Sequence, residues 1–316
     1  MKAVIIDTIS EYIGPELEKY GFRVDHHMLP STEELAGFIG EYELLVMRVD
    51  PFIDRSVIDA GKKLKAIAVC SAGTNHIDLK YAADKGVIVM NALGCNSNAV
   101  AELTMSKILD MNRYTVAANN EVKYKNIWNK YKWIGRELRG QTLGIIGLGR
   151  IGSRVGELAQ AYGMLVIAYD PYLSQEEAAA KGVDLVSLEE LLMCSDVITI
   201  HVPLTDETKN LISYPQIEMM KEDAIVINTA HGGILDEQAI YENLKSGKLS
   251  GLSVDVLASE LDSGGLTIDE IHLYSPLFQL DNTLISPHIG GATKEAYDAI
   301  GIMIVDKVAA AFGLKK

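Results

Sequence analysis

Short apolar runs alternate with longer amphipathic stretches along most of the chain. Runs such as Leu44–Met47 and Ala66–Val69 have the length and composition of buried strands, and the stretches between them have helical spacing. The same alternation resumes in the second half, for example at Val197–Ile200. Strands separated by helices form parallel sheets covered on both faces, so the pattern predicts an α/β fold of two doubly wound parallel-sheet domains.

Two long helical stretches, residues 98–119 and 292–312, divide the chain. A sequence of 316 residues predicts two domains, because a single core rarely grows beyond about 250–300 residues. We expect a discontinuous domain of residues 1–100 and 289–316, into which a second domain of residues 101–288 is inserted. The chain would then cross twice between the domains, and a cleft between them is the expected binding site.

The segment of residues 143–152 contains a dinucleotide-binding fingerprint. Gly147 can turn sharply out of a strand, Gly149 lets the backbone approach a pyrophosphate, and Gly152 lets the next helix pack closely. Asp170 ends the following apolar run, where a carboxylate binds the ribose hydroxyls of NAD and repels a 2′-phosphate. NAD is therefore the predicted cofactor, and an ordinary structural turn is the alternative.

Composition narrows the class of protein. The net charge of −14 argues against a nucleic-acid partner, because a phosphate backbone would be repelled by most of the surface. No apolar run approaches the roughly 20 residues of a membrane span, so no membrane partner is expected. The 3 cysteines are scattered without metal-ligand spacing, which predicts no metal site and favours a reducing, cytoplasmic location.

One segment, residues 121–139, departs locally from this acidic character. Basic residues interleave there with aromatic ones: Lys123, Lys125, Lys130, Lys132, Arg136 and Arg139 with Tyr124, Trp128, Tyr131 and Trp133. Such a segment can contact single-stranded nucleic acid. The acidic chain favours the other interpretation, an exposed or subunit-contacting arm.

Several motifs occur in a fixed order: residues 70–79, 98–102, 140–152, 201–205 with Thr208, 228–233, 253–256 and 286–289. Together they resemble the D-isomer-specific 2-hydroxy-acid dehydrogenase family over nearly the whole chain. The resemblance implies a flavodoxin-like substrate domain, a Rossmann NAD-binding domain and a homodimer. It also implies a cofactor site made of Gly147, Gly149, Arg150, Ile151, Gly152, Asp170, His201, Val202, Pro203, Thr208, Thr229, Ala230, Asp255 and Gly290.

The chemistry that the resemblance implies is hydride exchange between NAD(H) and a small 2-keto or 2-hydroxy acid. His288 matches the general acid/base, and its alternative is a histidine packed at a strand end. Glu260, five residues after Asp255, matches the carboxylate that pairs with this histidine, and its alternative is a solvated glutamate. Ala72 and Gly73 match the amides that hold the substrate carboxylate, although Gly73 also suits an ordinary turn.

His231 departs from the family pattern, which has arginine between Asn-Thr-Ala and Gly-Gly. Arginine stays charged and binds two oxygens at once, whereas histidine lacks this fork. Three interpretations follow: an altered substrate or a pH-dependent cation, a weakly active enzyme, or an NAD(H)-sensing binding protein. Arg48, after a predicted strand, either contacts the tail of the substrate or is solvated. We predict an NAD-dependent D-2-hydroxy-acid dehydrogenase, with His231, Glu260 and His288 as catalytic residues.

Overall fold

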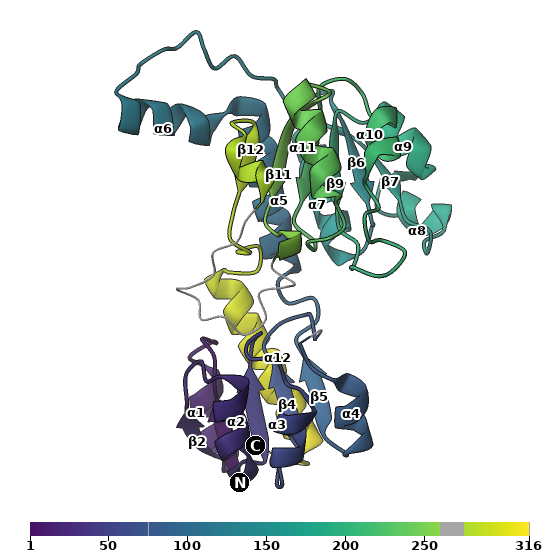
Figure 1. Cartoon of the computed structure of the whole chain (residues 1–316). Coiled ribbons are helices and arrows are strands. Elements are labelled where there is room, and N and C mark those ends of the chain that lie inside the picture. Colours follow the sequence, from purple (N-terminus) through teal and green to yellow (C-terminus); the bar gives the residue numbers. More distant parts are fainter. Residues whose placement is uncertain (75, 260–274, 316) are drawn as a thin grey trace. The chain divides into compact units, whose positions relative to one another are not determined.

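The structure is a computed structural model that describes residues 1–74, 76–259 and 275–315. Among these, residues 1–96 with 291–315 form one compact unit, and residues 97–259 with 275–290 form a second. Both units are parallel sheets covered by helices (Figure 1). The assignment of a substrate role to one domain and a cofactor role to the other stays a prediction.

The first unit contains a five-stranded sheet. Its strands are β1 (Lys2–Ile5), β2 (Arg23–His26), β3 (Leu44–Met47), β4 (Ala66–Val69) and β5 (Ile88–Asn91). Its helices are α1 (Ile13–Lys19), α2 (Thr32–Phe38), η1 (Ile39–Glu41), α3 (Arg55–Ala60), α4 (Leu79–Asp84) and α12 (Lys294–Ala311). All strands are parallel in the order β2-β1-β3-β4-β5, the flavodoxin-like order, and separate apolar clusters cover the two faces.

Side-chain caps determine where two of these helices begin. Helix α2 begins with a capping box, in which the Ser31 side chain accepts a hydrogen bond from the N–H of Glu34 and the Glu34 carboxylate accepts one from the N–H of Ser31. Helix α3 begins at Arg55, earlier than its apolar residues suggest, because the Asp54 carboxylate accepts hydrogen bonds from Ser56 and Val57.

The second unit contains a seven-stranded sheet. Its strands are β6 (Thr142–Ile146), β7 (Leu165–Tyr169), β8 (Asp184–Leu185), β9 (Val197–Ile200), β10 (Ala224–Asn228), β11 (Leu249–Val254) and β12 (Thr283–Ile285). Its helices are α5 (Ser97–Arg113), α6 (Thr115–Lys125), α7 (Arg150–Ala161), α8 (Gln175–Ala179), α9 (Leu188–Cys194), α10 (Tyr214–Met219), α11 (Glu237–Ser246) and η4 (Pro276–Gln279). The parallel order β12-β11-β10-β9-β6-β7-β8 contains the Rossmann order and reverses between β6 and β9.

The prediction of one helix over residues 98–119 is wrong, because the chain breaks between α5 and α6. Tyr114, at the break, has a φ of 56°, which ends a right-handed helix. Trp133 packs against the Tyr114 ring at a centroid distance of 5.9 Å, and its indole N–H donates to Glu121 at 3.1 Å. Helix α6 therefore leaves the direction of α5 and extends away from the sheet (Figure 1).

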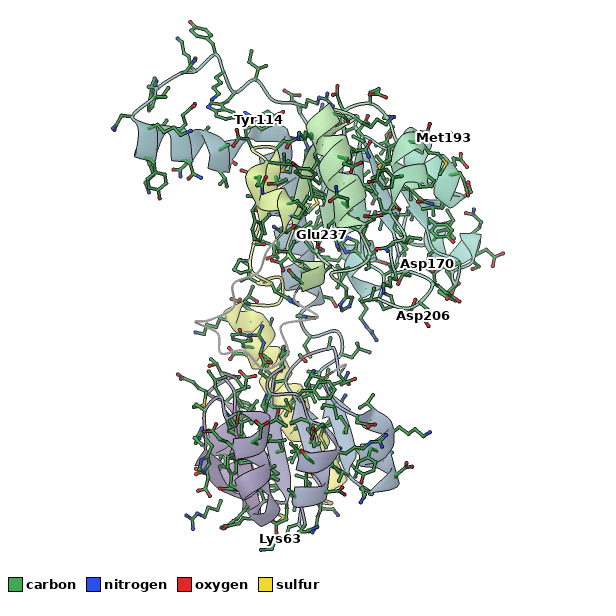
Figure 2. All side chains as sticks on the ribbon, viewed as in Figure 1. Lys63, Tyr114, Asp170, Met193, Asp206 and Glu237 are labelled. Carbon is green, nitrogen blue, oxygen red and sulfur yellow. The ribbon has the colours of Figure 1, made fainter. Side chains whose placement is uncertain are left out.

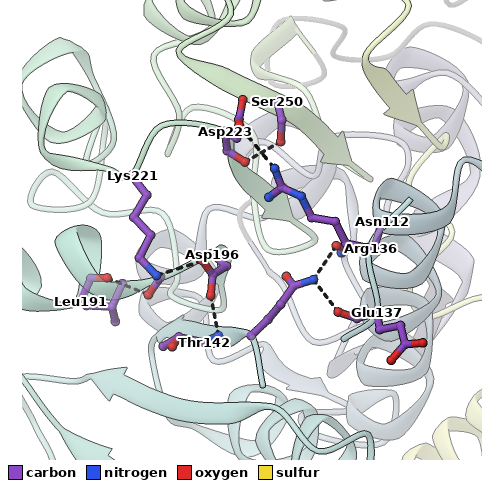
Figure 3. Close-up of polar contacts among 11 residues, drawn as sticks. Asn112, Arg136, Glu137, Thr142, Leu191, Asp196, Lys221, Asp223 and Ser250 are labelled. Carbon is purple, nitrogen blue, oxygen red and sulfur yellow. Dashed lines mark hydrogen bonds and ion pairs between the residues drawn. The ribbon is translucent and has the colours of Figure 1, made fainter. Parts of the chain in front are cut away.

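Charged side chains pair with one another where the strands of the second sheet begin (Figure 3). The Asp196 carboxylate accepts hydrogen bonds from the Thr142 N–H at 2.7 Å and from Lys221 Nζ at 2.9 Å. Arg136 pairs with Asp223 at 3.3 Å. We call this side of the sheet the amino edge, and the opposite side, where the strands end, the carboxyl edge.

Candidate functional site

The predicted site residues that the structure describes in the second unit lie at the carboxyl edge of its sheet. Six residues each follow a strand directly: Gly147 after β6, Asp170 after β7, His201 after β9, Thr229 after β10, Asp255 after β11 and Ser286 after β12. Because the strands are parallel, these positions share one edge, which is where open α/β sheets bind ligands.

The glycine-rich turn has the geometry that a pyrophosphate requires. Gly147 has a φ of 92°, and a Cβ on Gly152 would lie 2.0 Å from the Gly147 carbonyl oxygen. A Cβ on Gly149 would meet nothing within 4 Å, so this backbone is open to a ligand. No side chain caps α7, whose first N–H groups stay available for an anion. The turn therefore fits a dinucleotide.

Asp170 fixes this turn from the end of β7 (Figure 2). Its carboxylate accepts hydrogen bonds from the N–H of Leu148 at 2.9 Å and of Tyr172 at 3.0 Å. Lys181 Nζ donates to the Leu148 carbonyl oxygen at 3.0 Å. The carboxylate retains lone pairs for ribose hydroxyls and places a negative charge beside the turn, which suits NAD better than NADP.

The turn after β9 packs against the glycine-rich turn. A Cβ on Gly147 would lie 2.7 Å from Val202 Cγ1 and 2.8 Å from the carbonyl oxygen of His201. Burial lowers the pKa of His201 to about 3, so its ring is neutral. The Thr208 hydroxyl donates to the Pro203 carbonyl oxygen at 2.6 Å and holds the turn closed. Four residues of the predicted cofactor site are thus part of one packed turn.

The turn after β10 carries His231 and is held from inside by a buried amide. Asn228, 1% exposed, donates from Nδ2 to the His231 carbonyl oxygen at 2.9 Å and accepts from the Ala230 N–H at 3.0 Å. The hydroxyls of Thr229 and Thr104 lie 2.8 Å apart and join the turn to α5. The His231 side chain is half-buried at this edge.

Asp255 organises the turn that carries His288. The carboxylate is 1% exposed and accepts hydrogen bonds from the N–H groups of Ile289 at 3.0 Å and Gly290 at 2.7 Å, and from the Ser286 hydroxyl. Its own carbonyl oxygen accepts from the His288 N–H at 2.8 Å. His288 has a φ of 51°. These contacts fix the backbone of the predicted general acid/base.

Two further predictions concern residues around this edge. Glu260 lies outside the described residues, so its pairing with His288 stays a prediction. Arg150 and Ile151 form the first turn of α7, with Arg150 exposed and Ile151 half-buried.

The predicted substrate residues of the first unit also follow strands. Arg48 follows β3 directly, and Ala72 and Gly73 lie in the turn after β4. The Ser71 hydroxyl donates to the Arg48 carbonyl oxygen at 3.1 Å, and Asn91 Nδ2 donates to that of Ala72 at 2.7 Å. Among the hydrogen bonds of the described chain, none uses the N–H of Ala72 or Gly73. Both donors suit a carboxylate ligand.

Sequence reasoning missed Asp7, which follows β1 and is 8% exposed. Its carboxylate accepts hydrogen bonds from the N–H groups of Arg48 and Val49, both at 3.1 Å. The Arg48 guanidinium lies 5.4 Å from the centre of the Tyr297 ring. Burial also lowers the pKa of His76, in the turn after β4, to about 4. Asp7 is the second residue after β1, near the end of a strand as Asp170 and Asp255 are, but no pattern in the sequence indicated its distant partners Arg48 and Val49.

Within the described ranges, no group of three or more His, Cys, Asp and Glu residues is arranged to hold a metal ion. The helices found there are also too short or too polar for a membrane crossing.

Comparison with known proteins relates the chain to several dehydrogenases and reductases. A family described as "D-isomer specific 2-hydroxyacid dehydrogenase, NAD binding domain" matches residues 105–290. A D-3-phosphoglycerate dehydrogenase of Archaeoglobus fulgidus is 40% identical over 308 residues, which are 98% of this chain and 56% of that protein. A hydroxypyruvate reductase of Thermotoga maritima is 39% identical over 282 residues, 89% of each protein.

The fold comparison gives the same result. The crystal structure of D-lactate dehydrogenase from Aquifex aeolicus, complexed with NAD and lactic acid, matches with a TM-score of 0.81 and 30% identity. The match covers 98% of this chain and 96% of that one. The chain spans little more than half the length of the phosphoglycerate dehydrogenases that it matches, at 56% and 57%.

Proposed function

Because the chain belongs to the D-isomer specific 2-hydroxyacid dehydrogenase family, we propose that it exchanges a hydride between NAD(H) and a small 2-keto or 2-hydroxy acid of D configuration. The observation that carries the proposal is the carboxyl edge of the second sheet, where the glycine-rich turn, Asp170, the His231 turn and the His288 turn follow the parallel strands β6, β7, β10 and β12. The names of the relatives favour an enzyme over an NAD(H)-sensing binding protein.

The cofactor site consists of backbone groups and one carboxylate. The turn at Gly147 and Gly149 and the N-terminus of α7 would hold the pyrophosphate, and Asp170 would hold a ribose. The matched domain is an NAD-binding domain, in agreement with the predicted cofactor. NAD(H) bound there supplies or accepts the hydride.

His288 donates the proton to the substrate oxygen during reduction and removes it during oxidation. A histidine suits this role because both protonation states are accessible near neutral pH. Asp255 fixes the backbone on both sides of His288, so the ring starts from a defined position. Glu260, the predicted partner, would orient the ring and favour its protonated form.

We assign substrate binding to hydrogen-bond donors that would contact the carboxylate and the carbonyl oxygen of the substrate. The N–H groups of Ala72 and Gly73 supply two donors, and His231 supplies the contact that arginine makes elsewhere in the family. Arg48, whose backbone is fixed by Asp7, is the candidate for a polar tail on the acid. Such a tail distinguishes hydroxypyruvate or a phosphorylated acid from pyruvate.

A homodimer in the cytoplasm is also part of the proposal. The arm of residues 121–139 supports it, since Trp128 is 84% exposed and Tyr131 is 76% exposed. Large exposed aromatic side chains are typical of interfaces. Sedimentation of the wild type and of Trp128→Ser tests it: the wild type is expected to be a dimer and the variant a weaker one.

The test of the reaction is a panel of acids. We expect NADH absorbance to fall with at least one of pyruvate, hydroxypyruvate and 3-phosphohydroxypyruvate, and NADPH to serve less well. The panel is run at two pH values because two histidines are assigned to the site. No turnover with any acid, although NADH fluorescence shows binding, would contradict the proposed reaction and favour the sensing protein.

A further inference from the structure

Glu237, labelled in Figure 2, lies in the first turn of α11. Its carboxylate forms hydrogen bonds with two separate stretches of chain. One carboxylate oxygen accepts a hydrogen bond from the N–H of Ala258 at 2.7 Å. The other accepts one from the hydroxyl of Ser275, also at 2.7 Å. Ala258 lies in the exit from β11, and Ser275 precedes η4. A single side chain therefore joins these two stretches to α11.

The backbone that Glu237 holds packs against the turn that carries His231. A Cβ on Gly232 would lie 2.0 Å from the Leu257 carbonyl oxygen and 2.8 Å from the Ala258 nitrogen. Only glycine permits so close an approach of two backbones. Because His231 is the residue before Gly232, the position of the Leu257–Ala258 backbone determines where the His231 turn can lie.

These contacts are enclosed, so water does not readily replace them. The cavity beside them, lined by Gly232, Glu237, Leu257 and Leu277 among others, has a volume of about 10 Å³. That is near the lower limit for one water molecule. Ser275 is only 1% exposed. Loss of the Glu237 carboxylate would leave the buried Ser275 hydroxyl and the half-buried Ala258 N–H without their acceptor, and the backbone would have to move to satisfy them.

We propose that Glu237 is a positioning residue for His231: it fixes the Leu257–Ala258 backbone, against which the His231 turn packs, and ties that backbone to Ser275. The inference rests on the proposed function, because the position of His231 affects a reaction only if His231 contacts the substrate.

Three variants separate this role from a general effect on stability. Glu237→Ala removes both hydrogen bonds. Glu237→Gln can accept from Ala258 with its amide oxygen and donate to the Ser275 oxygen with its amide nitrogen. Glu242→Ala is the matched control, because Glu242 is an exposed glutamate on the same helix whose carboxylate also accepts two hydrogen bonds, in its case both from side chains, one of them Tyr214 at 2.9 Å.

Two measurements are made on each purified full-length variant. Hydrogen exchange of the protein without ligand reports on the anchor itself: peptides over residues 252–259 should exchange faster in Glu237→Ala, but not in Glu237→Gln or Glu242→Ala. Steady-state kinetics report on positioning: kcat/KM for the best 2-keto acid should fall about 10–100-fold in Glu237→Ala. It should fall less than about threefold in the other two variants. The Kd for NADH, from fluorescence, should change little, because the glycine-rich turn lies on other strands.

A double-mutant cycle tests whether the effect passes through His231. In a His231→Ala background, Glu237→Ala should lower kcat/KM far less than it does in the wild type. Equal effects in both backgrounds would overturn the inference, as would unchanged hydrogen exchange or a kinetic loss no larger than that of Glu242→Ala. A wild type that reduces no acid would remove the proposed function and this inference with it, and hydrogen exchange would still show whether Glu237 anchors the backbone.

Discussion

The two edges of the second sheet hold their polar groups in different ways. At the amino edge, Arg136 and Asp223 form an ion pair in which both side chains are more than half exposed. At the carboxyl edge, Asp255 is almost fully buried and its carboxylate accepts two backbone N–H groups. Exposed ion pairs contribute little to the free energy of unfolding. A buried acceptor that loses its donors, in contrast, destabilises the fold, because it keeps the cost of its lost hydration. The amino edge therefore tolerates change, and the carboxyl edge fixes geometry.

Two lysines show the same contrast. Among the described residues, Lys107, near the carboxyl edge, is the buried cation. Lys107 is 3% exposed on α5, and its Nζ donates to the Val254 carbonyl oxygen at 3.0 Å and to the Ser253 hydroxyl at 3.3 Å. Lys221, at the amino edge, bonds to Asp196 and remains partly exposed. Burial lowers the pKa of Lys107 to about 8, although the charge of Asp255 opposes the shift.

The largest expected effect comes from His288. We expect His288→Gln to lower kcat by about 100–10,000-fold, because proton transfer to the substrate oxygen is lost. Binding of NADH, measured by fluorescence, should be retained, and the exposed His26→Gln serves as the control. A variant that keeps more than about a tenth of the wild-type rate would mean that His288 is not the general acid/base.

Lys107 should give the carboxyl edge a pH-dependent stability. The pKa of Lys107 is about 8 in the folded protein, against an ordinary value of 10.5, so the unfolded chain binds more protons between these values. The free energy of unfolding should therefore rise with pH across that window, by about 3 kcal/mol at about 1.4 kcal/mol per pKa unit. Below pH 8, Lys107 is charged in the folded protein as well, and burying that charge lowers the free energy of unfolding by the full amount.

Urea unfolding of the wild type and of Lys107→Met at pH 7 and pH 10 measures this rise. Lys107→Met should be at least as stable as the wild type at pH 7 and should lack the rise. Lys221→Met, at the amino edge, is the control and should leave the rise in place. A wild type and a Lys107→Met variant with parallel pH dependence would show that the lysine stays protonated in the folded protein.

Several parts of the fold followed from local sequence. Strands such as Leu44–Met47 and Val197–Ile200 begin and end where their apolar runs do, because a strand buried on both faces needs only a short apolar run. The family and the fold are confirmed by the comparisons. The break at Tyr114 was not predicted, since it depends on Trp133 and Glu121, which return to that point only through the tertiary fold.

The residues of the candidate site also fall into those that local sequence indicates and those that depend on tertiary contacts. Gly147 and Asp170 could be proposed as site residues because that proposal depends only on a residue type at the end of a strand. Asp7 and Glu237 could not, because their partners, Arg48 in one case and Ala258 with Ser275 in the other, are distant in sequence. Periodicity reports which residues are buried, but it does not report which distant N–H a carboxylate meets.

His231 tests whether the carboxyl edge is adapted to pyruvate-like acids. We expect His231→Arg to raise kcat/KM for pyruvate by about 10–100-fold, because arginine stays charged and binds two oxygens together. Its activity should also fall less than that of the wild type as the pH rises through the range in which histidine loses its proton. Unchanged or lower activity in a correctly folded variant would indicate that His231 is adapted to another acid.

The smallest effect is expected at the amino edge, from Arg136→Ala. The pair with Asp223 is exposed and spans 3.3 Å, so its loss should lower the free energy of unfolding by less than about 1 kcal/mol, and by still less at high salt. The backbone N–H of Arg136, which donates to the Asn112 carbonyl oxygen at 2.9 Å, is retained in the variant. Urea unfolding at two salt concentrations and kcat with the best acid are the measurements. A change in kcat comparable to that of the carboxyl-edge variants would mean that the two edges are coupled through the sheet, and the contrast between an edge that tolerates change and an edge that fixes geometry would no longer hold.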